Sequence, residues 1–202
     1  MTAQFEEIKE KVRSLQSEKR FRHTLAVVKE AAYISKICAF SESEAEKAAL
    51  AALMHDITKC FSDKEQAEMA EKYGITEHYE APTVHEKTGA HFAREIFGAQ
   101  TVDGEIFSAI YCHTTGKEGM SALDMAVFIA DYTEETREHD VCREMRAYLH
   151  EKCEKLNGER EKAEALLRDV TMKIIASTLS FLTLKKRKID PATVEAWNFL
   201  AD

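Results

Sequence analysis

The chain has 202 residues and a formal net charge of −8. Its length suits one domain with a hydrophobic core large enough to fold unaided. The negative charge argues against nucleic acid as the main partner, because binding along a phosphate backbone requires a broad basic surface. It does not exclude a small anionic ligand, which would then need local cations, either metal ions or a few Lys and Arg side chains.

The composition favours helices. The chain has only 7 Gly and 2 Pro, too few turn residues for a many-stranded fold, whereas Ala, Glu, Lys and Leu are strong helix formers. The 5 cysteines form no CxxC pair, which predicts free thiols in a cytoplasmic protein. The charged N-terminal segment predicts no secretory signal, and no apolar run approaches the roughly 20 residues that span a bilayer, so we expect no membrane partner.

Apolar residues recur at helical spacing along almost the whole chain. In chain order, helices are predicted over residues 5–17, 20–39, 43–59, 63–73, 84–97, 103–113, 121–136, 139–156 and 160–184, with a last helix from Pro191 through Phe199. Ser41 or Ser43 suits the start of the third helix, and Gly74 the end of the fourth. We expect an all-α fold, with one domain over residues 1–202, a core at about 18–150 and C-terminal helices at 160–202 packing on it. An apolar face on helix 160–184 could serve a homodimer.

The pair His55-Asp56 follows directly on the apolar segment ALAALM, at the end of a predicted helix. A charged Asp in this position is costly to desolvate unless a positive group meets it. By itself, the pair could simply cap a loop. However, Asp131 follows a second apolar run, AVFIA, and His23 lies inside another predicted helix. Helical bundles build metal sites from inward-facing side chains of this kind, and imidazole with carboxylate suits iron, manganese or zinc.

Two more histidines extend this set, because His85 opens one predicted helix and His113 closes another. Adjacent residues diverge by about 100° around a helix, so Asp56 can reach a metal that His55 cannot. The economical arrangement places His23, His55, Asp56 and Asp131 on one metal and His85 and His113 on a second, with Asp56 bridging both. Two metals roughly 3.5–4 Å apart are typical of phosphoester and phosphoanhydride hydrolysis, because they acidify a bridging water and neutralise phosphoryl oxygens.

Further residues could contact a substrate: Lys59, Thr114, Thr115, Gly116 and Arg137. Lys59 follows the His-Asp pair by three residues and is either a surface lysine or a cation directed at a phosphate. The Thr-Thr-Gly triplet offers hydroxyls and a flexible backbone to phosphate oxygens, although alone it is weak evidence. Arg137 either pairs with Glu134 or Glu135 or reaches the substrate. We predict catalytic roles for Asp56 and Lys59.

The order of these residues, H…HD…D, is the pattern of the HD-domain metallophosphohydrolases. The segments RFRHTLAVV, ALMHDITK, VHEKTGAHFA, AIYCHTTGKEGMSALD and FIADYTEETR, together with the tail KIDPATVEAWNFL, resemble the YqeK-type branch. This branch comprises the HD-domain symmetrical diadenosine-tetraphosphate hydrolases of bacteria. The resemblance covers nearly the whole chain and implies a single HD-domain helical bundle.

The resemblance also implies a binuclear site, usually of iron, and hydrolysis of diadenosine tetraphosphate to two ADP. The ligands of that branch fall here on His23, His55, Asp56, His85, His113 and Asp131. One departure is Glu86, where the family commonly has Gly. If Glu86 points inward, it could crowd the nucleotide or change the metal preference, and if outward, it is neutral. Residues 137–141 also lack the Phe-Pro that often follows the arginine.

Three functions are therefore open. The leading hypothesis is hydrolysis of diadenosine tetraphosphate by a bridging hydroxide, with Lys59 and the Thr115-Gly116 loop holding phosphates. The second is a phosphohydrolase for another nucleotide: a nucleoside monophosphate, a deoxynucleotide or a guanosine alarmone. The third is a nucleotide-binding HD domain without catalysis. The ligands accept Fe, Mn, Co or Zn, so the metal is not fixed by the residues.

Overall fold

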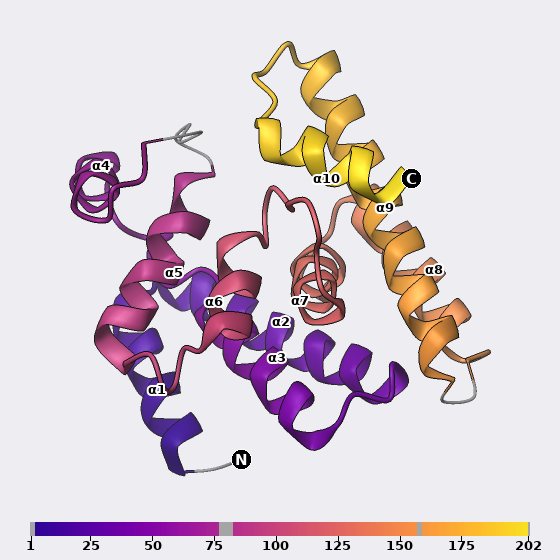
Figure 1. Ribbon diagram of the computed structural model, residues 1–202, viewed down its shortest axis with the longest axis horizontal. Coiled ribbons are helices and arrows are strands. Elements are labelled where there is room, and N and C mark those ends of the chain that lie inside the picture. Colours follow the sequence, from indigo (N-terminus) through magenta and orange to yellow (C-terminus); the bar gives the residue numbers. More distant parts are fainter. Residues whose placement is uncertain (1–2, 77–82, 157–158, 202) are drawn as a thin grey trace.

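A computed structural model describes residues 3–76, 83–156 and 159–201. Within these ranges the chain is helical and has no strand, which confirms the all-α prediction (Figure 1). In chain order, the helices are α1 Ala3–Leu15, α2 Glu18–Ile37, α3 Glu42–Met54, α4 Asp63–Lys72, α5 Val84–Phe97, α6 Gly104–Tyr111, α7 Ala122–Thr133, α8 Asp140–Cys153, α9 Arg160–Leu184 and α10 Pro191–Ala201.

The helix starts follow from local capping chemistry. The N-caps of α2, α3, α4 and α7 are serines, and each side chain accepts a hydrogen bond from a backbone N–H of the first turn. Of the two predicted caps for α3, the structure uses Ser41, which forms a capping box with Glu44. The start of α10 is held by Asp190, whose Oδ1 accepts the N–H of Ala192 at 3.0 Å.

Two of the helices that are shorter than predicted end beside candidate ligands. The predicted helix 43–59 was wrong beyond Met54, where α3 ends. Residues 55–60 instead form turns with three-residue spacing, such as Lys59 N–H to Asp56 O at 3.0 Å. The predicted helix 121–136 ends at Thr133, because Glu134 takes extended backbone angles (φ −58°, ψ 155°).

Helix α7 lies at the centre of the molecule and is buried on almost every side (Figure 1). Its residues contribute to two hydrophobic clusters. One joins α2 to α8, α9 and α10, and the other joins α1, α3, α5 and α6. The apolar run AVFIA is therefore packed on both faces, and Asp131 follows it on the last turn of a helix that cannot shift freely.

Helices α8 and α9 pack side by side, and α10 folds back against α9. The end of α9 exposes Phe181 (51%) and Leu184 (82%), and the neighbouring α10 exposes Val194 (41%). The homodimer through this face stays a prediction, as does the division into a core and C-terminal helices. In the described parts of the chain, no helix is both long and apolar enough to cross a membrane. All five cysteines are free.

Candidate metal centre

Six predicted ligands from five parts of the chain converge in the interior. They are His23 on α2, His55 and Asp56 in the turns after α3, His85 in the first turn of α5, His113 just after α6 and Asp131 on α7. Five of them are buried, with a relative exposure of 8% or less, and Asp131 is half-buried. The structure thus brings together every residue that the sequence analysis placed on a metal.

The first subsite consists of His23, His55, Asp131 and one oxygen of Asp56. His23 Nε2 lies 3.0 Å from Asp131 Oδ1 and 3.3 Å from His55 Nε2. Asp56 Oδ2 lies 3.6 Å from His23 Nε2 and 3.4 Å from His55 Nε2. Ligand atoms bound to one ion at its usual bond lengths are roughly 3–3.6 Å apart, so these spacings suit a shared cation.

The second subsite consists of His85, His113 and the other oxygen of Asp56. Asp56 Oδ1 lies 3.2 Å from His85 Nε2 and 3.7 Å from His113 Nε2, and the two Nε2 atoms are 3.2 Å apart. The two oxygens of the Asp56 carboxylate therefore face different pairs of histidines. This is the arrangement expected of a carboxylate that bridges two ions.

The donor chemistry of the histidines fits metal ligation. His55 and His113 each donate Nδ1–H to a backbone carbonyl, that of Ala52 and of Ile110, at 2.7 Å. Each Nε2 therefore presents a lone pair to the interior. Burial lowers the pKa of His85 to about 4, which keeps this ring neutral as a ligand requires.

In the first subsite, the protonation of His23 depends on the neighbouring carboxylates. Burial disfavours the charged form of His23, but hydrogen bonds to Asp131 and Glu134 outweigh it and raise its pKa to about 9. A cation at this point competes with that proton for Nε2. Burial also opposes ionisation of Asp56, yet the surrounding histidines hold its pKa well below its ordinary value. Both features describe an anionic cavity that favours a positive ion.

Two guanidinium groups lie on the more exposed side of the site. Arg20 Nη1 is 2.7 Å from Asp56 Oδ2, and Arg137 Nη2 is 2.6 Å from Asp131 Oδ1. Of the alternatives for Arg137, the structure shows a pair with the candidate ligand Asp131 and a longer approach to Glu134 at 3.8 Å. The sequence analysis missed Arg20, although it precedes His23 by three residues on α2 and so shares its helix face.

Lys59 lies beside the second subsite. Its Nζ is 3.0 Å from His85 Nδ1 and 3.2 Å from His85 Nε2. Burial lowers the pKa of Lys59, while the nearby Asp56 carboxylate acts in the opposite direction. The lysine thus faces the site rather than bulk solvent.

Hydrogen bonds to Glu86 hold the segment that follows His113. Glu86 is fully buried, and its Oε2 accepts the N–H groups of Thr114 at 2.8 Å and Thr115 at 3.1 Å. Its Oε1 accepts the Thr115 hydroxyl at 2.7 Å. Only the Thr114 hydroxyl turns toward a ligand, lying 3.3 Å from His85 Nε2. Of the two orientations considered for Glu86, the inward one is observed, and the phosphate-binding role of Thr115 stays a prediction.

Gly116 ends this segment in a left-handed conformation, with φ +71°. A Cβ atom at this position would lie 3.1 Å from the Cβ of Ala196 on α10 and 3.4 Å from the sulfur of Met120. Glycine is therefore required here for both conformation and space. Gly116 faces the side chains of Ala196 and Met120. Its contact with a substrate phosphate also stays a prediction.

Glu134 is a second residue that sequence reasoning did not assign to the site. It is fully buried, and its Oε1 accepts the Nδ1–H of His23 at 3.1 Å. A carboxylate behind a ligating histidine fixes the orientation of the ring and makes it a better ligand. The signal in the sequence was the position of Glu134 three residues after Asp131.

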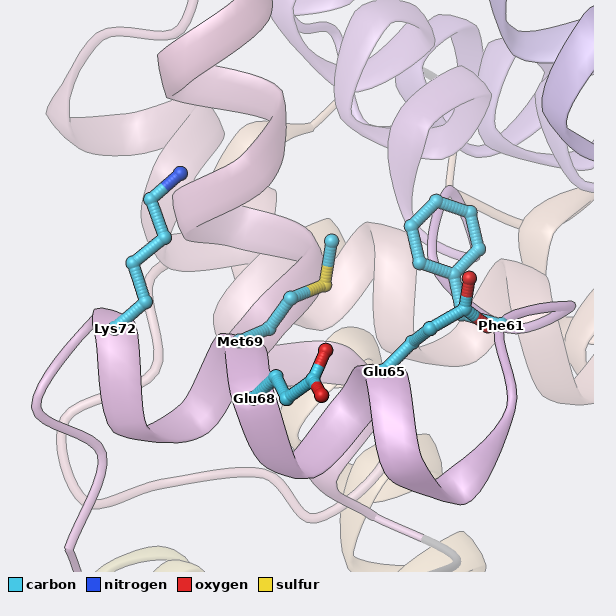
Figure 2. Close-up of a pocket in the computed structure, with 5 residues that line it drawn as sticks. All are labelled: Phe61, Glu65, Glu68, Met69 and Lys72. Carbon is cyan, nitrogen blue, oxygen red and sulfur yellow. The ribbon is translucent and has the colours of Figure 1, made fainter.

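A shallow hollow on α4 lies apart from these residues. It is lined by Phe61, Glu65, Glu68, Met69 and Lys72, and Figure 2 shows that they come from α4 and the turn before it. None of the six candidate ligands lines it. Glu65 is engaged in the capping box of α4 and Lys72 pairs with Glu95. The hollow therefore offers no group for the chemistry discussed above.

The fold and site define a helical hydrolase class in which histidines and aspartates from facing helices surround metal ions. The HD-domain family matches residues 20–136, more than half of the chain, and the matched range contains all six candidate ligands. The chain belongs to the HD-domain family.

Two relatives are similar over almost their whole length. One is a symmetrical bis(5'-nucleosyl)-tetraphosphatase of Halalkalibacterium halodurans, 28% identical over 91% of this chain and 90% of its own. The other, of the same name, is from Bacillus subtilis and is 26% identical over 91% of this chain and 90% of its own. These matches confirm the resemblance to the YqeK-type branch, and the chain is an HD-domain phosphohydrolase.

A solved structure shows the same fold. It is described as a predicted HD superfamily hydrolase involved in NAD metabolism, from Clostridium acetobutylicum. It is 26% identical, has a TM-score of 0.79, and the superposition covers 98% of this chain and 96% of that one. The all-α HD bundle is therefore confirmed from residue 3 to residue 201 in the described ranges.

Proposed function

We propose that this protein hydrolyses diadenosine tetraphosphate to two ADP at a site holding two metal ions. The observation that carries the proposal is the Asp56 carboxylate, whose two oxygens face the histidine pairs His23/His55 and His85/His113. The names of the relatives from Halalkalibacterium halodurans and Bacillus subtilis support the substrate. We propose iron as the metal, with manganese, cobalt or zinc as alternatives that the same ligands accept.

Two such ions, when bound, supply Lewis acidity toward phosphoryl oxygens and make water nucleophilic near neutral pH. The residues of the chain supply the rest. The four histidines and Asp131 would hold the metal ions in place, and Asp56 would contribute a ligand to both subsites. The buried surroundings keep these side chains from reorienting, so the site is preorganised for charge that develops on a phosphate.

A tetraphosphate chain is strongly anionic, whereas the protein carries a net charge of −8. Local cations must therefore bind the phosphates. We propose that Lys59 contacts a phosphate beside the second subsite and acts in catalysis, and that Arg137 does so beside the first. Arg20 adds a third cation on the same open side. The Thr114 hydroxyl supplies a neutral donor near His85.

The test is product analysis. Metal-loaded protein is incubated with diadenosine tetraphosphate, and the nucleotides are separated by anion exchange. We expect ADP as the sole product, because cleavage at the central anhydride gives two identical halves. Equal amounts of AMP and ATP would overturn the symmetrical mechanism, since the cut would then lie at an outer anhydride.

A second candidate is another nucleotide anhydride. It is favoured by the description of the Clostridium acetobutylicum neighbour, which is said to be involved in NAD metabolism. A panel of dinucleotides, nucleoside monophosphates, deoxynucleotides and guanosine tetraphosphate, ranked by kcat/KM, decides between the candidates. We expect diadenosine tetraphosphate to rank first by at least about tenfold, which corresponds to about 1.4 kcal/mol of transition-state stabilisation.

A further inference from the structure

Glu86 is a buried carboxylate at the metal centre that is not a ligand of either subsite. It lies in the first turn of α5 directly after His85, and its side chain is fully buried. Three donors surround it: the N–H groups of Thr114 and Thr115 on Oε2, and the Thr115 hydroxyl on Oε1. All three belong to the two residues that follow His113.

The geometry of these donors is that of an anion-binding site. Two consecutive backbone N–H groups directed at one oxygen form a concave site that suits a negative charge. A buried carboxylate is costly without such partners, and buried N–H groups are equally costly without an acceptor. Glu86 and residues 114–115 therefore stabilise each other, and a carboxyl group of the chain occupies the donors that were expected to bind a substrate phosphate.

The contact connects the two histidines of the second subsite. His85 precedes Glu86 on α5, and His113 precedes the segment that Glu86 holds, so one carboxylate fixes the spacing of two ring nitrogens that lie 3.2 Å apart. The first subsite does not depend on this contact. Its histidines are on α2 and after α3, and His23 is oriented by Glu134 instead.

We propose that Glu86 is a positioning residue that fixes His113 against His85 and thereby sets the metal affinity of the second subsite. This inference rests on the two-metal site of the proposed function. The second subsite has two histidines and a shared oxygen of Asp56, so it has fewer ligands of its own than the first. Loss of the contact between Glu86 and residues 114–115 should therefore lower the metal affinity of the second subsite.

The experiment measures metal binding without any nucleotide. Metal-free wild-type protein and the variants Glu86→Gln and Glu86→Ala are titrated with Mn²⁺ by calorimetry and with Co²⁺ by absorption spectroscopy. Glu86→Gln is the conservative variant, because its carbonyl oxygen can still accept the N–H groups of residues 114 and 115 while its NH₂ group donates to the Thr115 hydroxyl. We expect the second ion to bind about 10- to 100-fold more weakly in Glu86→Ala and close to the wild-type affinity in Glu86→Gln, with the first ion within about twofold of wild type in both.

Asp124→Asn is the matched control. Asp124 is also a buried carboxylate that accepts a hydroxyl, from Ser108 at 2.7 Å, and a backbone N–H, from Ser121 at 2.9 Å. It touches neither histidine of the second subsite among the contacts described. We expect this variant to lose stability while both ions bind within about twofold of wild type.

Two outcomes overturn the inference. One is a folded Glu86→Ala protein that binds both ions as wild type does. The other is an equal loss at both subsites, which indicates a general structural role. If Glu86→Ala does not fold, Thr115→Val removes only the hydroxyl donor, and it must still weaken the second ion selectively. Wild-type protein that binds two ions but releases no ADP would reject the proposed function and leave the inference on Glu86 standing.

Discussion

The two subsites share Asp56 but differ in their surroundings. The first is charged: His23 is oriented by the Glu134 carboxylate, and Asp131 pairs with Arg137. The second lies beside Lys59 and the buried Glu86, and His113 donates its Nδ1–H to the backbone carbonyl of Ile110. The first also has a second carboxylate ligand, whereas the second has none of its own.

This difference predicts unequal metal affinity. More ligands and more negative charge hold a divalent ion more tightly, because each added carboxylate contributes Coulomb attraction at short range. The first subsite should therefore fill first and empty last. The second subsite should be the one that exchanges its ion, and its metal affinity should depend on the packing of the protein around it.

The largest effect is expected from Asp56→Ala, which removes the shared ligand and with it the distinction between the subsites. Hydrolysis should fall by about 10³-fold or more, because metal ions supply several kcal/mol of charge stabilisation and each 1.36 kcal/mol is tenfold. Metal content should drop below one ion per chain in elemental analysis. Asp63→Ala is the control, because Asp63 is an exposed aspartate on the first turn of α4. This variant should keep the hydrolysis rate and the metal content of wild type. Two ions retained in Asp56→Ala would contradict the bridging role.

Chelation should separate the subsites without mutation. We expect a chelator such as EDTA to remove the second ion first, so that activity is lost while about one ion per chain remains bound. Metal content and activity are measured on the same samples over time. Added Mn²⁺ should restore activity, because the first subsite keeps the fold of the site intact. Simultaneous loss of both ions would show that the two subsites are equivalent.

Glu134→Gln should act on the first subsite alone. The amide cannot stabilise the His23 ring as the carboxylate does, so the first ion should bind about 10- to 100-fold more weakly. Glu135→Gln is the matched control, because Glu135 is exposed and only pairs with Lys29 at the surface. Isothermal titration calorimetry measures the metal affinity of both variants. Equal affinities in the two variants would remove the role assigned to Glu134.

The smallest effect is expected from Thr88→Val beneath the second subsite. The buried Thr88 hydroxyl donates to Gln66 Oε1 at 2.6 Å and lies 3.1 Å from the Thr58 hydroxyl. Its loss should lower the free energy of unfolding by about 1–3 kcal/mol, seen as a lower denaturant midpoint at unchanged slope. Thr183→Val on the exposed end of α9 should change stability by less than about 0.5 kcal/mol. A Thr88→Val protein as stable as wild type would show that the network is dispensable.

Much of the fold was predictable because its signals are local. The range 160–184 agrees with α9 at both ends, and the range 84–97 agrees with α5, since apolar spacing and turn residues mark them. The end of α3 was not predictable. Residues 55–59 contain no Gly or Pro to mark the end of a helix, and the structure shows turns where His55 and Asp56 face the buried site.

The convergence of the six candidate ligands was predictable because each is a polar residue placed where apolar sequence leads into the core. Their partners were not. Glu134 meets His23 across 111 residues of sequence, and Glu86 meets Thr115 across 29. Such contacts depend on how distant helices and loops pack against each other, and local spacing in one sequence does not specify this packing. The predicted phosphate loop illustrates this, because Thr115 offers suitable donors that the structure shows engaged by Glu86.

The contact of Gly116 with Ala196 has a consequence for sequence variation. The last helix places a methyl group where a side chain at position 116 would begin, so the two positions share one small volume. A larger residue at 196 would push the segment that follows His113, although α10 itself carries no ligand. We therefore expect relatives that keep glycine at position 116 to keep a small residue at position 196, so that the C-terminal helix evolves under the constraints of the metal centre.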